Sequence, residues 1–330
     1  MATLTATNPT LLDQINRTAP NGQIAQIVEA LTERNPVLMD ATAMEGNLAT
    51  GHRVTIRDGL PAVSWRRMNE GINPSKSTTI QVDETCGMLE GRSVVDCALA
   101  RLNGNEAAFR ASEDAAFYQA LNNEMADAIF YSSTNTDPEK IHGFTPRFDS
   151  LSGGNADNIV DSTTTDTGGA DYRSIWFITW GPDTAYMIYP KGSQAGISVE
   201  DLGKEYEEDS GGTKKFLAWR THFKWDCGIC IKDWRYHVRI ANIDVDTDST
   251  AEANLINDMV NAYNRIHDLN SGRTVCYMPR AILTRLDLAV INKSNMYFTP
   301  VEWHGRTVNS FRGIPIVTCD ALNTTEATVT

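Results

Sequence analysis

The longest uninterrupted pattern of apolar and polar positions in the chain runs from Gly104 to Ser132 and has the period of an α-helix. Asn103 followed three residues later by Glu106 predicts a capping box at its start. At 1.5 Å per residue the helix would span roughly 40 Å, so we expect it to act as a structural spine. Its apolar positions recur at four- and eight-residue spacings and share one face: Phe109, Phe117, Leu121, Met125 and Ile129.

The segment before this helix, from His52 to Val82, has the opposite character. A strand-like stretch at Val54–Ile56 is followed by an Asp58-Gly59 turn signal, a polar middle and a β-branched return, Ser77–Val82. Two antiparallel halves would each be about 40 Å long, whereas a compact chain of this length has a radius of gyration near ~20 Å. We therefore expect an arm that projects from the body. A solvated hairpin folded back on its own domain is the alternative.

Charge suggests what this arm would lie on. The arm carries a net charge of +3 and the spine helix a net charge of −4. A basic arm and an acidic helix in one chain suit reciprocal contact between identical subunits. The residues expected at such contacts are Arg53, Arg57, Trp65, Arg66, Arg67 and Lys76 of the arm, and Glu113, Asp114, Glu124 and Asp127 of the helix.

The remaining patterns mix helices and strands in segregated runs, which predicts the α+β class. We expect an adaptable leader over residues 1–50, with short helices near Pro9 and over Gly22–Leu31, and docking by Leu38, Met39 and Met44. Further helices are expected after a Ser249–Glu252 capping box and from Pro279, and a closing strand at Gly313–Cys319.

Between the spine helix and these later helices we expect loops and strands. Ser150–Asp171 is rich in Gly and Ser and predicts a loop or domain boundary, and the acidic stretch Glu200–Gly212 predicts an exposed loop. Ser174–Trp180 and Thr184–Tyr189 predict a hairpin across Gly181-Pro182-Asp183. Strict alternation predicts half-buried strands with one polar face over Leu217–Trp225 and Trp234–Ile240, so that His222 and His237 would be solvated.

Composition narrows the function classes. The net charge of −13 argues against an electrostatic nucleic-acid binder, which needs clustered Lys and Arg. The first residues lack the apolar core of a secretory signal, and no run approaches the ~18 apolar residues of a membrane span. Six scattered cysteines are unlike a disulfide scaffold, so we expect reduced thiols made in a cytosol.

Candidate chemistry is sparse, and we expect no catalytic, cofactor or metal site. Cys227 and Cys230 form a CxxC pair with no partner pair for zinc, so two buried cysteines are favoured over an enzyme that uses them. The series Asp244, Asp246 and Asp248 resembles the start of a calcium loop but lacks its Gly and Glu positions. The six histidines show no ligand spacing.

Several strings from residue 50 onward are similar to the major capsid proteins of tailed bacteriophages, particularly the short-tailed group typified by phage epsilon-fifteen and a Bordetella phage. The strings are Trp65–Gly71, Ser75–Thr79, Trp180–Pro182, Tyr189–Ser193, Arg220–His222, Asp233–Tyr236, Arg239–Ile243 and Gly313–Val317. The resemblance implies the Johnson, or Hong Kong phage-like, fold. Its divisions would be an N-terminal arm (1–50), an extension loop (51–84), a peripheral domain with a spine helix (85–149, helix 104–132), an axial domain (150–295) and a C-terminal return to the peripheral domain (296–330).

By this resemblance the chain would self-assemble through hexamers and pentamers into an icosahedral shell around double-stranded DNA, without catalysis, sequence-specific DNA binding or membrane contact. Its other partners would be a cement or decoration protein, a scaffolding protein and a portal, and it would reside in the virion after synthesis in the host cytoplasm. The alternative within the same fold is the shell of a cellular nanocompartment.

Overall fold

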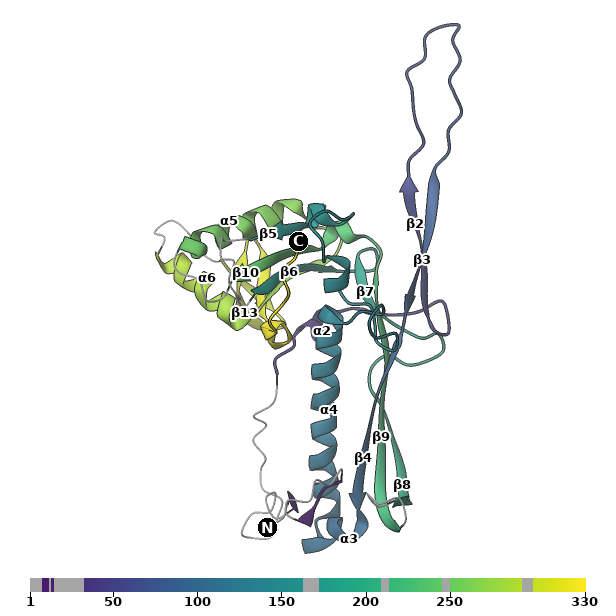
Figure 1. Ribbon diagram of the computed structural model, residues 1–330, viewed down its shortest axis with the longest axis vertical. Coiled ribbons are helices and arrows are strands. Elements are labelled where there is room, and N and C mark those ends of the chain that lie inside the picture. Colours follow the sequence, from purple (N-terminus) through teal and green to yellow (C-terminus); the bar gives the residue numbers. More distant parts are fainter. Residues whose placement is uncertain are drawn as a thin grey trace.

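The computed structural model describes residues 8–11, 13–14, 33–162, 172–208, 214–244, 250–292 and 299–330. Figure 1 shows three parts: a rounded body with helices on its outside, a long helix beside a narrow sheet, and a two-stranded arm that extends past both. Helices and strands occupy separate regions of the chain, which agrees with the predicted α+β class.

Strand β6 organises the body because its alternating side chains serve two separate cores. Ile175 and Phe177 face a core closed by helices α5 and α6. Trp176, Ile178 and Trp180 face the opposite core, which the C-terminal end of helix α4 covers. Both faces of the strand are therefore buried, as for the central strand of a covered sheet. The bounds are β6 Tyr172–Trp180, α5 Thr250–Arg265, α6 Arg280–Asn292 and α4 Glu106–Tyr131.

The body sheet assembles around β6 from segments far apart in the sequence. β6 is antiparallel to both β10 and β11, and β11 continues in parallel to β14. β7 joins β9 (Lys215–Ile231) on one side and pairs in parallel with β1 on the other. The remaining bounds are β1 Ala43–Glu45, β5 Ile159–Asp161, β7 Ala185–Tyr189, β10 Val238–Asp244, β11 Arg273–Met278, β12 Thr299–Trp303, β13 Arg306–Phe311 and β14 Ile314–Thr318.

Helix α4 confirms the predicted spine. It runs along the three-stranded sheet β4-β9-β8, where Phe223 is fully buried and stacks on Phe117 with ring centroids 5.3 Å apart. Phe109, Leu121, Met125 and Ile129 are buried as the helical period predicts. The strands are β4 Gly87–Asp96, β8 Ser198–Glu208 and β9 Lys215–Ile231, and the short helices are α2 Val37–Asp40, α3 Cys97–Ala100, η1 Leu102–Gly104, η2 Thr145–Arg147, η3 Ala156–Asn158, η4 Trp234–Tyr236 and η5 Asp320–Asn323.

The predicted capping box at the start of the spine is wrong. Asn105 occupies the N-cap position, and its side chain makes no capping hydrogen bond. The Glu106 carboxylate instead accepts a hydrogen bond from the indole nitrogen of Trp219 and lies 3.8 Å from Arg101. A side chain of the adjacent sheet has therefore replaced the backbone amide of a capping box as the partner of Glu106.

The arm is an antiparallel pair of strands, β2 (Gly51–Gly59) and β3 (Thr78–Thr85), joined by residues 60–77 without strand structure. The chain does not turn at Asp58-Gly59, where the ladder has a bulge and ends, so that prediction is wrong. It reverses near Asn69, whose φ of 65° lies in the left-handed region that asparagine tolerates. Figure 1 shows the arm extending from its junction with the body in the direction opposite to the free ends of β4 and β8.

Two predictions made from local sequence are wrong because the strands concerned pair with other segments of the chain. β6 and β7 do not form a hairpin: they meet only at Trp180 and Ala185, in parallel orientation. The acidic stretch predicted as a loop is strand β8, whose residues are largely exposed as expected but pair along β9 from Ser198 opposite Lys224 to Glu208 opposite Lys215. Opposite charges across these two strands favour a pairing that the acidic sequence alone disfavours.

The region from Trp234 to Ile240 also differs from its prediction. Trp234–Tyr236 is a 3-10 helix, and every residue of the following strand β10 is buried. His237, expected in solvent, is fully buried, and burial lowers its pKa to about 3. His222 lies half-buried, 3.2 Å from Glu90. The half-buried strand with a polar face is therefore correct for β9 and wrong for β10.

Several predictions fall wholly or partly outside the described residues: the leader helix over Gly22–Leu31, the Ser249–Glu252 capping box and the aspartates 246 and 248. In the described part of the leader, α2 packs on the body through buried Val37, whereas Met39 and Met44 are exposed. The passage predicted as a loop from Ser150 includes strand β5, which pairs with β10.

Candidate assembly interface

The root of the arm is fixed to the body by a buried ion pair. Glu84, at the end of β3, accepts hydrogen bonds of 2.7 and 2.6 Å from both terminal nitrogens of Arg147. The Arg147 side chain also donates to the backbone carbonyls of His142 and Gly143, and the side chain of Glu84 is only 6% exposed. Two-pronged pairs between arginine and a carboxylate fix geometry as well as energy, so this contact sets the direction of the arm.

A second contact holds the other strand of the arm. The Tyr186 hydroxyl on β7 lies 3.0 Å from Nε2 of His52, and the two rings meet edge to face. Asn47 hydrogen-bonds to both the amide and the carbonyl of Arg53. Gly51, where the strand begins, passes so close to the Glu84 carbonyl that a Cβ there would collide with it. Both strands are therefore tied to the body at their base.

Beyond its base the arm exposes large apolar side chains. The Trp65 side chain is fully exposed and Met68 is 92% exposed. Ser75 donates a 2.7 Å hydrogen bond to the Ala62 carbonyl across the loop. Exposed apolar groups gathered on one segment mark an interaction surface. The others are Leu60, Val63, Ile72 and Ile80.

The predicted contact residues of the arm are available at its surface. Arg53 is paired within the arm, with its Nε 2.5 Å from Asp83. The other four basic residues and Trp65 are exposed: Arg57, Trp65, Arg66, Arg67 and Lys76. Figure 1 shows the loop that carries most of them pointing away from α4, so a single chain does not bring the basic loop and the acidic helix together.

The predicted acidic residues on α4 lie in two settings. Glu113 and Asp114 are half-buried, and Asp114 hydrogen-bonds to Ser93 of β4 while burial raises its pKa. Glu124 is exposed and lies 3.2 Å from Lys140, and burial raises the pKa of the neighbouring Asp127. Part of the negative charge of the helix is thus used within the chain, and contact of these residues with another copy stays a prediction.

The structure adds a charged surface that sequence reasoning missed, on the side of the β4-β9-β8 sheet turned away from α4. Arg220 on β9 forms ion pairs with Glu205 and Glu207 of β8, and Glu207 also accepts from Arg92 of β4 at 2.9 Å. His222, Glu90 and Lys224 extend the series. The signal was present in the sequence, since an acidic stretch precedes a strand whose polar face is basic.

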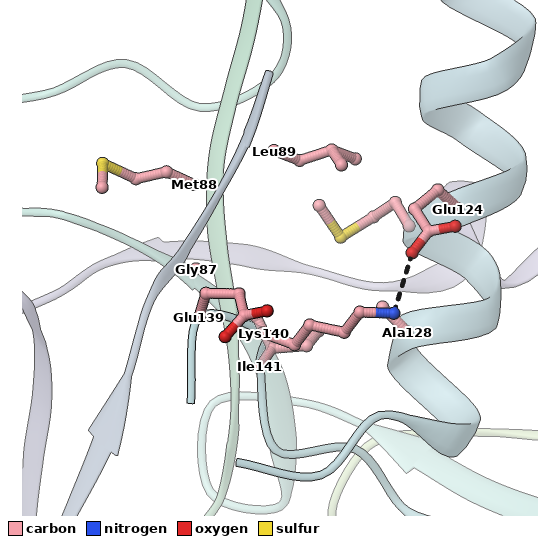
Figure 2. Close-up of a pocket in the computed structure, with 9 residues that line it drawn as sticks. Gly87, Met88, Leu89, Glu124, Ala128, Glu139, Lys140 and Ile141 are labelled. Carbon is pink, nitrogen blue, oxygen red and sulfur yellow. Dashed lines mark hydrogen bonds and ion pairs between the residues drawn. The ribbon is translucent and has the colours of Figure 1, made fainter. Parts of the chain in front are cut away.

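A pocket of about 160 Å³ lies beside the root of the arm, between β4, the C-terminal half of α4 and residues 139–141. Figure 2 shows Leu89 and Ala128 on facing sides of it and the Glu124–Lys140 ion pair at its edge. Sequence reasoning did not find it because three separated segments contribute. Its lining residues are Gly87, Met88, Leu89, Glu124, Met125, Ala128, Glu139, Lys140 and Ile141.

The CxxC pair has no reactive setting. Cys227 and Cys230 are both buried in β9, and burial raises the pKa of Cys227 to about 12. Residues three apart in a strand point to opposite faces, so the two thiols join different apolar clusters. The described residues contain no group of three His, Cys, Asp or Glu side chains placed to hold a metal ion. None of the helices in this part of the chain is long and apolar enough to span a membrane.

The model of the family described as "Major capsid protein GP7" matches residues 19–330. The chain belongs to this family. It is 35% identical to a chain in the cryo-EM structure of bacteriophage Epsilon15, with a TM-score of 0.78 and full coverage of both chains. No curated protein matches.

A more distant structure is similar in fold, and a second gives a lower score. The capsid of bacteriophage JBD30 has a TM-score of 0.51 at 11% identity, covering 89% of this chain and 93% of that one. The SrpI encapsulin of Synechococcus elongatus PCC 7942 has a TM-score of 0.46 at 7% identity, covering 73% and 98%. The latter score is too low to support the nanocompartment alternative.

Family membership and the Epsilon15 match confirm the main predictions: a tailed-phage major capsid fold, and a major capsid protein that forms the icosahedral shell of a phage. The protein is therefore a component of the virion, and its family is a structural one. The resemblance to a Bordetella phage stays a prediction.

Proposed function

We propose that the arm of each major capsid subunit lies on a neighbouring copy and that this contact joins subunits in the shell. The exposure of Trp65 and Met68 on an arm whose base is rigidly held supports this, because a two-stranded ribbon is only marginally stable alone in water. The contact residues proposed are Arg53, Arg57, Trp65, Arg66, Arg67 and Lys76 on the arm, and Glu113, Asp114, Glu124 and Asp127 on α4 of the neighbour.

Individual exposed ion pairs at this contact are weak, at about 0.2–1 kcal/mol each. Repetition over a closed shell multiplies them, and weak single contacts allow incorrectly joined subunits to separate. The apolar side chains of the loop supply the non-electrostatic part of the contact. The arm therefore combines apolar anchors with basic residues that select an acidic partner surface.

We also propose that the chain divides into the parts implied by the fold. Residues 51–84 act as the extension loop, 85–149 with α4 as the peripheral domain, 150–295 as the axial domain, and 296–330 as the return to the peripheral domain, with 1–50 as the N-terminal arm. The contacts of η5 with α4 support the last assignment. Hexamers and pentamers of the subunit would enclose the genome, and the net charge of −13 suits a container that does not bind DNA tightly.

The remaining partners proposed are a portal, a scaffolding protein and a decoration protein, with assembly in the host cytoplasm and no catalytic step. Buried thiols with raised pKa values support the absence of cysteine chemistry.

The test of the arm contact is to replace Arg57, Arg66 and Arg67 by Glu, which changes the charge of exposed residues only. We expect the subunit to keep its thermal stability while the concentration needed for shell formation rises. A control that replaces exposed Arg101, Lys191 and Lys215 by Glu makes the same change in net charge away from the arm. Assembly of the arm variant at the wild-type concentration would show that its charges do not take part.

A further inference from the structure

The pocket beside the arm root has the size and lining to receive one aromatic ring. Its volume of about 160 Å³ is close to that of an apolar protein cavity, about 150 Å³, that holds benzene. Leu89, Met125 and Ile141 form apolar walls. Gly87 lets residues 139–141 pass close to β4 at the edge of the pocket, because a Cβ there would meet the Glu139 carbonyl at 3.0 Å.

The arm carries one aromatic side chain that could fill such a pocket. Trp65 is the single aromatic residue between positions 60 and 77, and its side chain is fully exposed. The loop of residues 60–77 points away from α4 in Figure 1, and the Trp65 side chain is fully exposed, so its ring is not in the pocket of its own chain. An occupant from the arm must therefore come from a second copy.

The charges around pocket and ring are complementary. Glu124 and Glu139 line the pocket, and Lys140 is engaged by Glu124 at 3.2 Å. Arg66 and Arg67 follow Trp65 directly, are exposed, and would face this acidic rim. Tryptophan and arginine that enter a pocket at the centre of an interface are the residue types that most often dominate binding energy.

We propose that the Trp65 ring of one subunit inserts into the pocket between β4 and α4 of a neighbouring subunit and anchors the arm there. This proposal rests on the proposed arm contact. It adds the residue at the centre of that contact and the pocket that receives it. The ring displaces water from an apolar surface, and the two arginines fix the orientation of the loop on the rim.

The test compares three single variants of the full chain by the subunit concentration at which shells form. Trp65→Ala removes the ring and should raise that concentration about tenfold or more. Trp65→Phe keeps a ring that fits the pocket and should assemble within about threefold of wild type. Met68→Ala removes another apolar side chain of the same contact surface, one not assigned to the pocket, and should raise that concentration by less than Trp65→Ala does. Both positions are exposed, so each variant should fold normally.

A pocket variant tests the other side of the contact. Ala128→Phe places a ring in the pocket from its own chain and should weaken assembly about as much as Trp65→Ala does. The double variant, Trp65→Ala with Ala128→Phe, should need no higher subunit concentration for shell formation than the more impaired single variant. The reason is that both changes remove the same contact. If Ala128→Phe does not fold, the Trp65 series decides alone.

Wild-type assembly by Trp65→Ala, or a larger loss for Met68→Ala than for Trp65→Ala, overturns the proposal. So does a full additional loss in the double variant. If the Arg-to-Glu arm variant is impaired and Trp65→Ala is not, the arm contact stands and its seating in this pocket is wrong. If neither is impaired, the arm contact itself fails.

Discussion

Glu84 and Arg147 face each other through two parallel hydrogen bonds, at the point where the arm leaves the body. The adjacent residue of the same strand, Asp83, forms a similar pair with Arg53 but in solvent, with both side chains about half exposed. The buried pair anchors the arm, whereas the exposed pair contributes little to stability. The difference arises because the loss of one partner destabilises a buried charge far more than an exposed one. This contrast between neighbouring positions provides a matched experiment.

Replacing Glu84 by Gln should therefore lower the free energy of unfolding by roughly 3 kcal/mol, since it leaves the Arg147 charge largely buried without a carboxylate. Asp83→Asn should cost less than about 1 kcal/mol. Urea denaturation of the unassembled subunit measures both. Hydrogen exchange should also show faster exchange in β2 and β3 of the Glu84 variant, and equal effects of the two substitutions would contradict this account of the root.

The C-terminal tail is held by a second buried pair. Glu326 accepts from Arg239 at 2.6 Å and from the Tyr131 hydroxyl at 2.8 Å, and the Arg239 side chain is 1% exposed. Glu326→Ala should destabilise the subunit by roughly 3–5 kcal/mol in a thermal or urea titration. Changing both partners to apolar residues, Arg239→Met with Glu326→Leu, should recover most of the loss. A double variant as unstable as Glu326→Ala would show that the pair is needed for more than charge compensation.

His237 should make the stability of the subunit depend on pH. It is fully buried, its Nδ1 accepts from the Thr179 amide, and burial holds its folded-state pKa near 3, below the 6.5 of an exposed histidine. Below pH 6.5 the unfolded chain binds a proton that the folded chain does not. The free energy of unfolding therefore decreases as the pH is lowered from 6.5 to 3, by up to about 1.4 kcal/mol per pH unit.

His237→Asn supplies an oxygen for the Thr179 amide and does not titrate, so the slope of unfolding free energy against pH should become shallower in this window. Burial also lowers the pKa values of His52 and His142, which contribute with the same sign in both proteins and cancel in the comparison. Above pH 7.5 the two slopes should agree. Identical slopes between pH 4 and 6 would mean that His237 is accessible to protons in the folded state.

The features predicted correctly from sequence are those whose signal is local. An unbroken apolar period gave α4 to within two residues at each end, and β-branched runs gave both strands of the arm. The capsid family strings gave the fold and the function. These segments carry their pattern in their own residues, so no distant partner had to be known.

The predictions that were wrong, and the features that were missed, depend on residues that lie far apart in the sequence. β8 is an acidic strand whose Glu207 forms ion pairs with Arg220 of the adjacent β9 and with Arg92 of β4, the strand beyond β9. Arg239 is buried because Glu326 arrives from the far end of the chain. The pocket needs β4, α4 and residues 139–141 together, and no local pattern marks its lining. The contact residues themselves belong to two chains, which one sequence cannot place side by side.

A cryo-EM map of the assembled shell at side-chain resolution tests the central claim directly. We expect residues 60–77 of each subunit to contact α4 and β4 of a neighbouring copy, with Arg66 and Arg67 near the acidic residues of that copy. A map in which the loop touches only its own chain, or is surrounded by solvent in every copy, would contradict it.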